Sequence, residues 1–142
     1  MAKDYFHNVV KVALEQDGWE ITHDPYELRL DAIKVLNTRM NIDLGAEKII
    51  AAQKHNEKIA VEVKSLLGPS LIYDLHNLVG QYFDYQIGLE FQEPQRKLYV
   101  AIPSIAYQRL NGQPFFEKVI ERAKLKFIIF DIENQSVLKW KS

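Results

Sequence analysis

The segment Lys-Ile-Ala-Val-Glu-Val-Lys at residues 58–64 alternates between large hydrophobic residues and small or charged ones. This alternation predicts a β-strand that has one apolar face and carries Glu62 and Lys64 on the other. Residues 43–53 precede this strand, and the polar residues 54–57 lie between the two segments. The pattern therefore predicts a β-hairpin, which we take as the centre of the fold.

The rest of the chain divides into helical and strand-like patterns. Helices are expected over residues 4–17, ended by Gly18, and over 70–89, 104–110 and 115–124, with Ser70 as an N-cap. Further strands are expected over 19–22, 97–102, 126–131 and 137–140. The pattern also places Phe83 and Phe115 on the buried faces of their helices. This order predicts an α/β, restriction-endonuclease-like fold, with a central mixed β-sheet flanked by helices.

Composition narrows the protein class. At 142 residues the chain is expected to form a single domain, 1–142, and its 47% hydrophobic and 26% charged residues are ordinary for a soluble globular protein. The absence of cysteine excludes disulfides and thiolate metal sites, and fits a cytoplasmic location. Neither a membrane-spanning apolar run nor a signal peptide is expected.

The charge balance limits how the protein could contact nucleic acid. The formal net charge is −1, whereas proteins that coat DNA are far more basic. Any binding of DNA would therefore need a local basic patch.

Asp43, Glu62 and Lys64 form the main candidate site. Folding the hairpin can bring the Asp43 carboxylate toward Glu62 and Lys64. Two carboxylates suit Mg²⁺ or Mn²⁺, and a lysine can hold or activate a water or a phosphate oxygen. An Asp near the start of one strand, followed by Glu-x-Lys on the next, resembles the PD-(D/E)xK nuclease signature. The alternative is a solvated strand face that carries a charge pair.

A second motif lies on the helix that follows. Gln81 and Tyr85 are four residues apart and share a helix face, so an amide and a phenol can brace Lys64, a carboxylate or a DNA phosphate. The pair resembles the Gln-x-x-x-Tyr element of RecB-like nucleases. The alternative is a core aromatic residue beside a surface glutamine.

The acid set has two further candidates. Pairing around a turn at residues 55–56 would place Glu47 close to Lys64, so Glu47 either replaces Asp43 or supports it. Resolvase-like members of the nuclease superfamily carry a Glu about one helix length before a glycine such as Gly18. His7 falls near that place, which makes it an additional candidate; the alternative is a residue on a solvated stripe.

Blocks along the whole chain resemble the XisH family, the fdxN element excision controlling factors of cyanobacteria. These blocks are residues 7–11, 17–19, 21–25, 43–47, 59–65, 80–81, 130–131 and 139–140. The resemblance implies a role in programmed DNA excision, alongside a site-specific recombinase and a small companion factor, XisI.

Two functions follow as expectations. In the first, the protein is an accessory factor that retains a metal-dependent endodeoxyribonuclease site. Mg²⁺ or Mn²⁺ is the expected cofactor if that site is catalytically active. In the second, it is a non-catalytic module that binds DNA or an XisI-like companion and steers the recombinase. A toxin–antitoxin-like pair is a third alternative. The sequence does not determine the oligomeric state, and a homodimer is an open alternative by analogy with nucleases of this fold that cut two strands.

Overall fold

The structure is a computed structural model that describes residues 2–28 and 49–142. The helices in these ranges are α1 (Ala2–Gln16), α2 (Leu71–Gln92), α3 (Ser104–Leu110) and α4 (Pro114–Ala123). The strands are β1 (Glu20–His23), β2 (Ile49–Lys54), β3 (Glu57–Val63), β4 (Lys97–Pro103), β5 (Phe127–Asp131) and β6 (Ser136–Lys141). The element types and their order agree with the prediction. Within the described ranges, no helix has both the length and the apolar character needed to cross a membrane.

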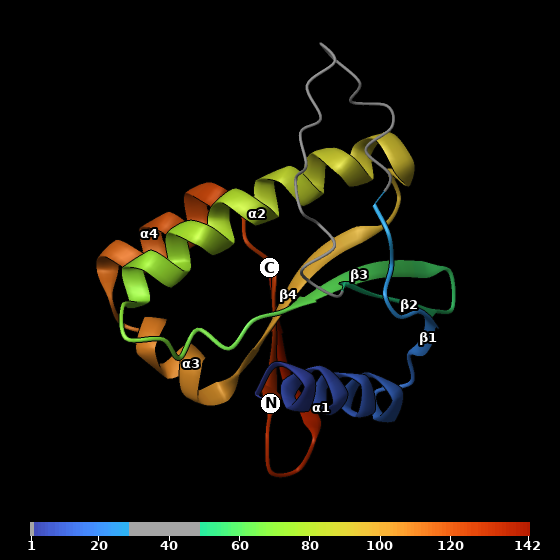
Figure 1. Ribbon diagram of the computed structural model, residues 1–142, viewed down its shortest axis with the longest axis horizontal. Helices are drawn as coiled ribbons and strands as arrows, with labels where there is room; N and C mark the ends of the chain where they lie inside the picture. The colour runs from blue at the N-terminus through green and yellow to red at the C-terminus, as the bar shows by residue number, and fades with distance from the viewer. Residues whose placement is uncertain (1, 29–48) are drawn as a thin grey trace.

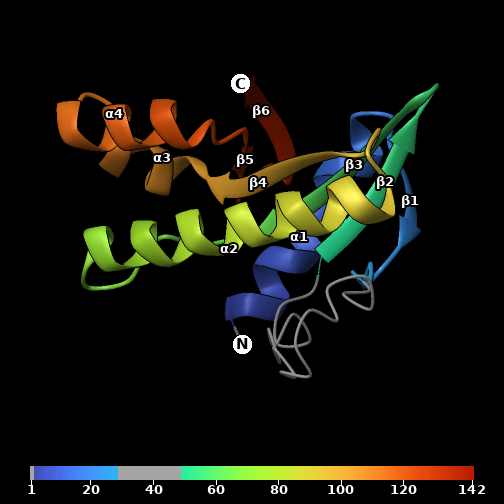
Figure 2. The same ribbon diagram turned by 90° about the horizontal axis from the view of Figure 1, so that it is seen from above.

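The strands form one mixed sheet in the order β1-β2-β3-β4-β5-β6 (Figures 1 and 2). The pairs β1–β2, β2–β3 and β5–β6 are antiparallel, whereas β3–β4 and β4–β5 are parallel. Parallel neighbours need crossover connections, and α2 and the α3–α4 pair supply them. This confirms the α/β class with a mixed central sheet; the restriction-endonuclease-like assignment, with which the topology is compatible, stays a prediction.

The β2–β3 hairpin has the predicted register. Ile49 pairs with Glu62 and Lys54 pairs with Glu57, so the turn consists of His55 and Asn56. His55 adopts a left-handed conformation with φ of 55°, which a tight hairpin turn requires. The first strand of the hairpin, predicted within residues 43–53, is confirmed from Ile49 onward. Residues 43–48 lie outside the described residues.

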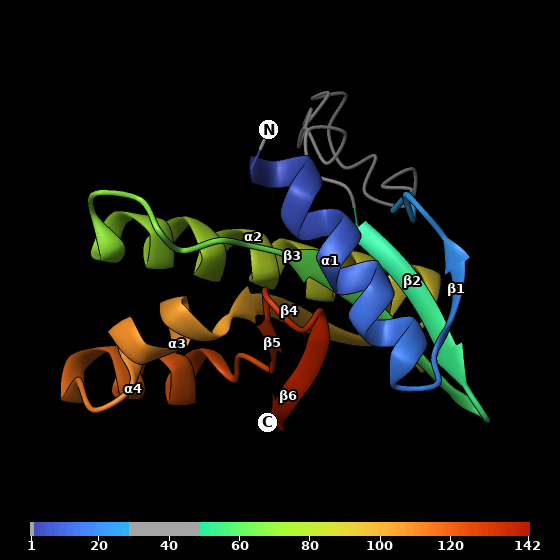
Figure 3. The same ribbon diagram turned by 90° about the horizontal axis from the view of Figure 1, so that it is seen from below.

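Helices cover both faces of the sheet. Figures 1 and 2 show α2 on one side together with α3 and α4, and Figure 3 shows α1 lying across the opposite side. The core beneath α2 contains Ala60 of β3, while the core beneath α1 contains Ile59 and Val61. Strand β3 is therefore buried on both faces, as is common where parallel strands are covered by crossover helices.

Helix α2 begins where the sequence predicted. Ser70 is the N-cap, and its hydroxyl accepts a hydrogen bond from the Tyr73 N–H at 3.3 Å. The buried side chains follow at intervals of three or four residues: Leu75, Leu78, Tyr82, Tyr85 and Leu89.

The placement of Phe83 and Phe115 was predicted wrongly. Phe83 is 65% exposed because it follows the buried Tyr82 by one position, which turns it away from the core-facing stripe. Phe115 is 59% exposed because α4 lies at the edge of the core and fully buries none of its residues.

The corrected face of α2 can be tested with two substitutions. Leu78→Ala should lower the free energy of unfolding by about 2–5 kcal/mol, because it opens a cavity at a fully buried position. Phe83→Ala should change it by less than about 0.5 kcal/mol, since that ring is exposed. Urea unfolding followed by circular dichroism measures both, and comparable losses in the two variants would contradict the assigned face.

Candidate functional site at the end of strand β3

Glu62 is a buried carboxylate on β3. It pairs with Ile49 on β2 and with Val100 on β4, and both neighbours belong to the core beneath α2. Paired residues in adjacent strands point to the same face, so Glu62 also faces α2. Glu62 is only 1% exposed. This burial excludes a solvated strand face for Glu62.

Lys64 provides the opposite charge. Its Nζ lies 3.4 Å from Glu62 Oε1, and its side chain is 19% exposed. Its backbone N–H donates to the Ala101 carbonyl oxygen at 2.9 Å, which continues the contact with β4 just past the end of β3. The structure therefore brings together the two charged residues of the predicted Glu-x-Lys motif, with the amine closer to solvent than the acid.

The segment after Lys64 is held by side chains from α2 and α3. Arg109 on α3 donates to the carbonyl oxygens of Leu66 and Gly68, the latter at 3.1 Å. Asp74 on α2 accepts from the Gly68 N–H at 3.0 Å. A Cβ atom at Gly68 would lie 2.6 Å from an Asp74 side-chain oxygen, so a larger residue there would require the Asp74 carboxylate to shift. These contacts fix the path of the chain from the site into α2.

Gln81 and Tyr85 lie on α2, which covers the face of the sheet that carries Glu62. Tyr85 is 2% exposed and belongs to the same core cluster as Ile49 and Val100, the two register partners of Glu62. The Gln81 Oε1 atom is buried and has no hydrogen-bond partner within the described part of the chain. Because buried polar atoms are nearly always satisfied, this acceptor is available to a donor that the described residues do not supply.

Tyr82, which lies between these two residues, has a structural role. Its hydroxyl donates to the Leu98 carbonyl oxygen at 3.0 Å. Burial raises the pKa of Tyr82 to about 12, so the phenol hydroxyl stays protonated. Its hydrogen bond to Leu98 joins α2 to β4.

The predicted metal ligands are only partly described. Glu62 offers a carboxylate in a region of low exposure, but Asp43 and Glu47 lie outside the described residues. Within residues 2–28 and 49–142, no three histidine or acidic side chains gather closely enough to hold a metal ion. A set of three such side chains that includes Glu62 would thus need at least one from the rest of the chain, where Asp43 lies.

His7 lies on α1, against the opposite face of the sheet. Its Nε2 atom is 2.7 Å from Asp24 Oδ1, and Lys11 Nζ is 2.8 Å from Asp24 Oδ2. Burial alone would raise the pKa of Asp24, but the hydrogen bonds from Lys11 and His7 outweigh it and lower the pKa below its ordinary value. His7 is therefore joined to a cation–carboxylate cluster that links α1 to the segment following β1.

A second buried network was not predicted. Arg96 is 6% exposed and donates to the Ile59 carbonyl oxygen at 2.9 Å and to both Glu93 carboxylate oxygens at 3.1 and 3.2 Å. The Tyr26 hydroxyl also donates to Glu93, and the Arg96 guanidinium lies 4.7 Å from the Tyr26 ring centre. Burial would raise the pKa of Glu93, but the bonds from Tyr26 and Arg96 lower it. In the sequence, only the three-residue spacing of Glu93 and Arg96 could have indicated an ion pair. The contacts with Tyr26 and Ile59 join residues that are distant in sequence.

The Asp24 cluster predicts a specific dependence of stability on pH. Asp24→Asn should cost roughly 1 kcal/mol of unfolding free energy at neutral pH, because the charge that receives Lys11 and His7 is lost. A carboxyl whose pKa is lowered by folding stabilises the fold above its ordinary pKa of 3.8 and loses that contribution as the pH falls through its folded pKa. Urea titrations at several pH values should therefore show the gap between wild type and variant closing in acid.

Asp84→Asn is the matched control, since Asp84 is exposed on α2. It should leave stability nearly unchanged across the same pH range. A gap for Asp24→Asn that stays constant into acid would contradict the proposed linkage.

Comparisons with known proteins agree with each other. A family model described as XisH protein matches residues 1–138. The crystal structure of an XisH family protein from Nostoc punctiforme PCC 73102 is 36% identical, with a TM-score of 0.83, over 97% of this chain and 99% of that one. The crystal structure of an fdxN element excision controlling factor protein from Anabaena variabilis is 35% identical, with a TM-score of 0.83, over 98% of this chain and 99% of that one. Among curated proteins, no sequence matches this chain significantly.

Proposed function

Since the chain belongs to the XisH family, we propose that it acts in the control of DNA excision through a metal-dependent, nuclease-like site at Glu62 and Lys64. The role in excision control comes from the relative described as an fdxN element excision controlling factor. The nuclease-like chemistry comes from the residues of the site. Fold alone would not assign it, because one fold serves many functions.

The burial of Glu62 is the observation that carries this proposal. A carboxylate that is 1% exposed costs free energy to desolvate, and an ion pair such as its contact with Lys64 at 3.4 Å often does not repay that cost. Well-packed hydrophobic residues in place of such a pair often leave stability equal or higher. Ionisable pairs held in this way are frequent at functional sites. A functional requirement explains the pair better than stability does.

The roles of the site residues follow from their chemistry. Glu62, together with Asp43, would hold Mg²⁺ or Mn²⁺, with Glu47 as the alternative or supporting acid. The ion, when bound, would polarise a phosphodiester and lower the pKa of a water molecule. Lys64 would position the attacking water or a phosphate oxygen, since its amine is the more exposed member of the pair. Gln81 and Tyr85 would brace Lys64 or the phosphate from α2.

A second candidate function is a non-catalytic control module that binds a partner protein. Several large hydrophobic side chains on the helices are strongly exposed, namely Ile72, Tyr73, Phe83 and Phe91 on α2 and Phe115 on α4. Exposed hydrophobic side chains are common at protein interfaces when they are contiguous. An XisI-like companion, a recombinase or a second copy of the chain would then be the partner, and the net charge of −1 would be no obstacle.

The nuclease proposal predicts cleavage or nicking of DNA that requires Mg²⁺ or Mn²⁺. Lys64→Ala and Glu62→Gln should each lower the rate at least about 100-fold, because one removes the positioning amine and the other a metal ligand. Linear, branched and supercoiled DNA should be assayed on gels with stoichiometric protein, with and without an XisI-like companion. Lys118→Ala on α4 and Glu90→Gln on α2 are matched controls at exposed positions. The proposal fails if every substrate stays intact, or if the site variants cut as fast as wild type.

The two candidate functions predict different effects of Lys64→Ala on DNA excision in cells that excise an fdxN-type element. If the site is catalytic, excision should be lost while the companion still co-purifies with the variant. If the protein only binds a partner, excision should persist in Lys64→Ala and should instead be lost when Tyr73 and Phe115 are both replaced by Ser. Circular dichroism of each purified variant shows whether it is folded.

A further inference from the structure

A pocket lies on the opposite face of the sheet from Glu62. It has a volume of about 400 Å³ and is lined by Asp17, Trp19, Lys54, His55, Glu57, Tyr99 and Trp140. Trp19, Tyr99 and Trp140 all pack against the core beneath α1, which places this aromatic pocket on that side. Its walls come from four separated parts of the chain: the turn after α1, the β2–β3 hairpin, β4 and β6. None of these residues contributes to the candidate nuclease site.

Three aromatic rings form one wall of the aromatic pocket. The rings of Trp19 and Trp140 have centres 5.5 Å apart and are tilted by 35°. Tyr99 meets Trp140 edge-on, at 5.0 Å and 88°. Trp19 is 7% exposed, so the wall is anchored in the core. The face of an aromatic ring is the negative end of its quadrupole, so a ring face that is open to the pocket would attract a cation.

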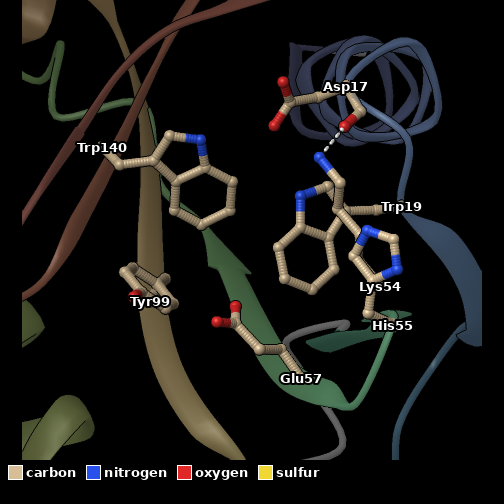
Figure 4. A pocket seen from close by; sticks show the side chains of 7 residues that line it. All are labelled: Asp17, Trp19, Lys54, His55, Glu57, Tyr99 and Trp140. Carbon is tan, nitrogen blue, oxygen red and sulfur yellow. Dashed lines mark hydrogen bonds between the residues drawn. The ribbon is translucent and has the colours of Figure 1, made fainter.

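One ammonium group of the protein, that of Lys54, already lies over a ring of this wall. Lys54 Nζ lies 6.0 Å from the centre of the Trp19 ring and donates to the Asp17 carbonyl oxygen at 2.7 Å (Figure 4). The amine of Lys54 is thus held on the Trp19 side of the aromatic pocket. Tyr99 and Trp140 form the rest of the wall. No lysine or arginine is among the lining residues there, and the Lys126 ammonium lies 6.0 Å from the centre of the Tyr99 ring.

The residues that line the aromatic pocket carry more negative than positive charge. Two carboxylates, Asp17 and Glu57, and one ammonium, Lys54, line it, which leaves one net negative charge among the lining residues when His55 is neutral. Figure 4 shows the Glu57 carboxylate directed toward the space beside Tyr99.

We propose that the aromatic pocket binds an organic cation, an alkylammonium or guanidinium group, against Tyr99 and Trp140 with Glu57 as its counter-ion. The group could belong to a free small molecule or to a lysine or arginine side chain of a protein. The two sources share one chemistry, namely a positive charge on an apolar frame that the rings can surround. This site does not depend on the nuclease-like chemistry proposed for the other face.

Intrinsic fluorescence reports directly on this pocket, because the chain has two tryptophans and both line it. Tetramethylammonium and arginine amide test the free cation, and a short neutral-ended peptide with one central arginine tests the side chain. Each cation that binds should give a saturable change in emission. Tighter binding of the peptide than of arginine amide would assign the site to a protein partner, and the reverse order would assign it to a free cation.

Glu57→Gln is the main variant, since Glu57 is exposed at the hairpin turn and its replacement should leave the fold intact. It should weaken cation binding about five-fold, because it removes the counter-ion while keeping the shape. Glu121→Gln on α4 is the matched control and should bind as wild type does. Tyr99→Leu, accepted only if its urea transition matches that of wild type, should weaken binding further.

Three results would overturn the proposal. One is the absence of any saturable change with the cations up to about 100 mM, a range that covers very weak binding. Another is equal affinity of Glu57→Gln and wild type. The third is a preference for adenosine monophosphate over arginine amide, which would identify the wall as a platform for a base instead of a cage for a cation.

Discussion

The structure depends on how a single carboxylate, that of Glu62, is accommodated inside the sheet. Strand β3 occupies an inner position, with β2 on one side and β4 on the other, and helices cover both of its faces. An acid in such a position loses most of its hydration, so its charge needs nearby groups that replace water. Lys64, two residues further along the same face, is one of them. The strand thus carries its own counter-ion, positioned where β3 ends and solvent begins.

The surroundings hold this arrangement from several directions. Arg109 and Asp74 fix the chain just after Lys64, so α2 starts from a defined place. At the other end of α2, Arg96 and Glu93 tie the helix to the start of β3 through the Ile59 carbonyl oxygen. The helix that carries Gln81 and Tyr85 is therefore anchored at both ends over the strand that carries Glu62. A site built on anchored elements of this kind keeps its geometry better than one built on loops.

The two faces of the sheet offer different chemistry. The face beneath α2 contains the acid–amine pair and a buried amide oxygen, which suit a metal ion or a phosphate. The face beneath α1 contains the indole and phenol rings of the aromatic pocket with two carboxylates at its rim, which suit a cation. Strands β3 and β4 contribute residues to both faces: Glu62 and Val100 to the one, Glu57 and Tyr99 to the other.

The sequence by itself determined the order of elements, the position of the β2–β3 turn and the pairing of Glu62 with Lys64 on one strand face. These are local properties: they follow from periodicity, from turn-forming residues and from the two-residue repeat of a strand. The tertiary structure decided which faces are covered. It buried Glu62 under α2, exposed Phe83 and Phe115, joined His7 to Asp24, and assembled the Arg96 network and the aromatic pocket from distant segments. Burial and long-range contact depend on how whole elements pack, and the pattern of a single segment does not encode them.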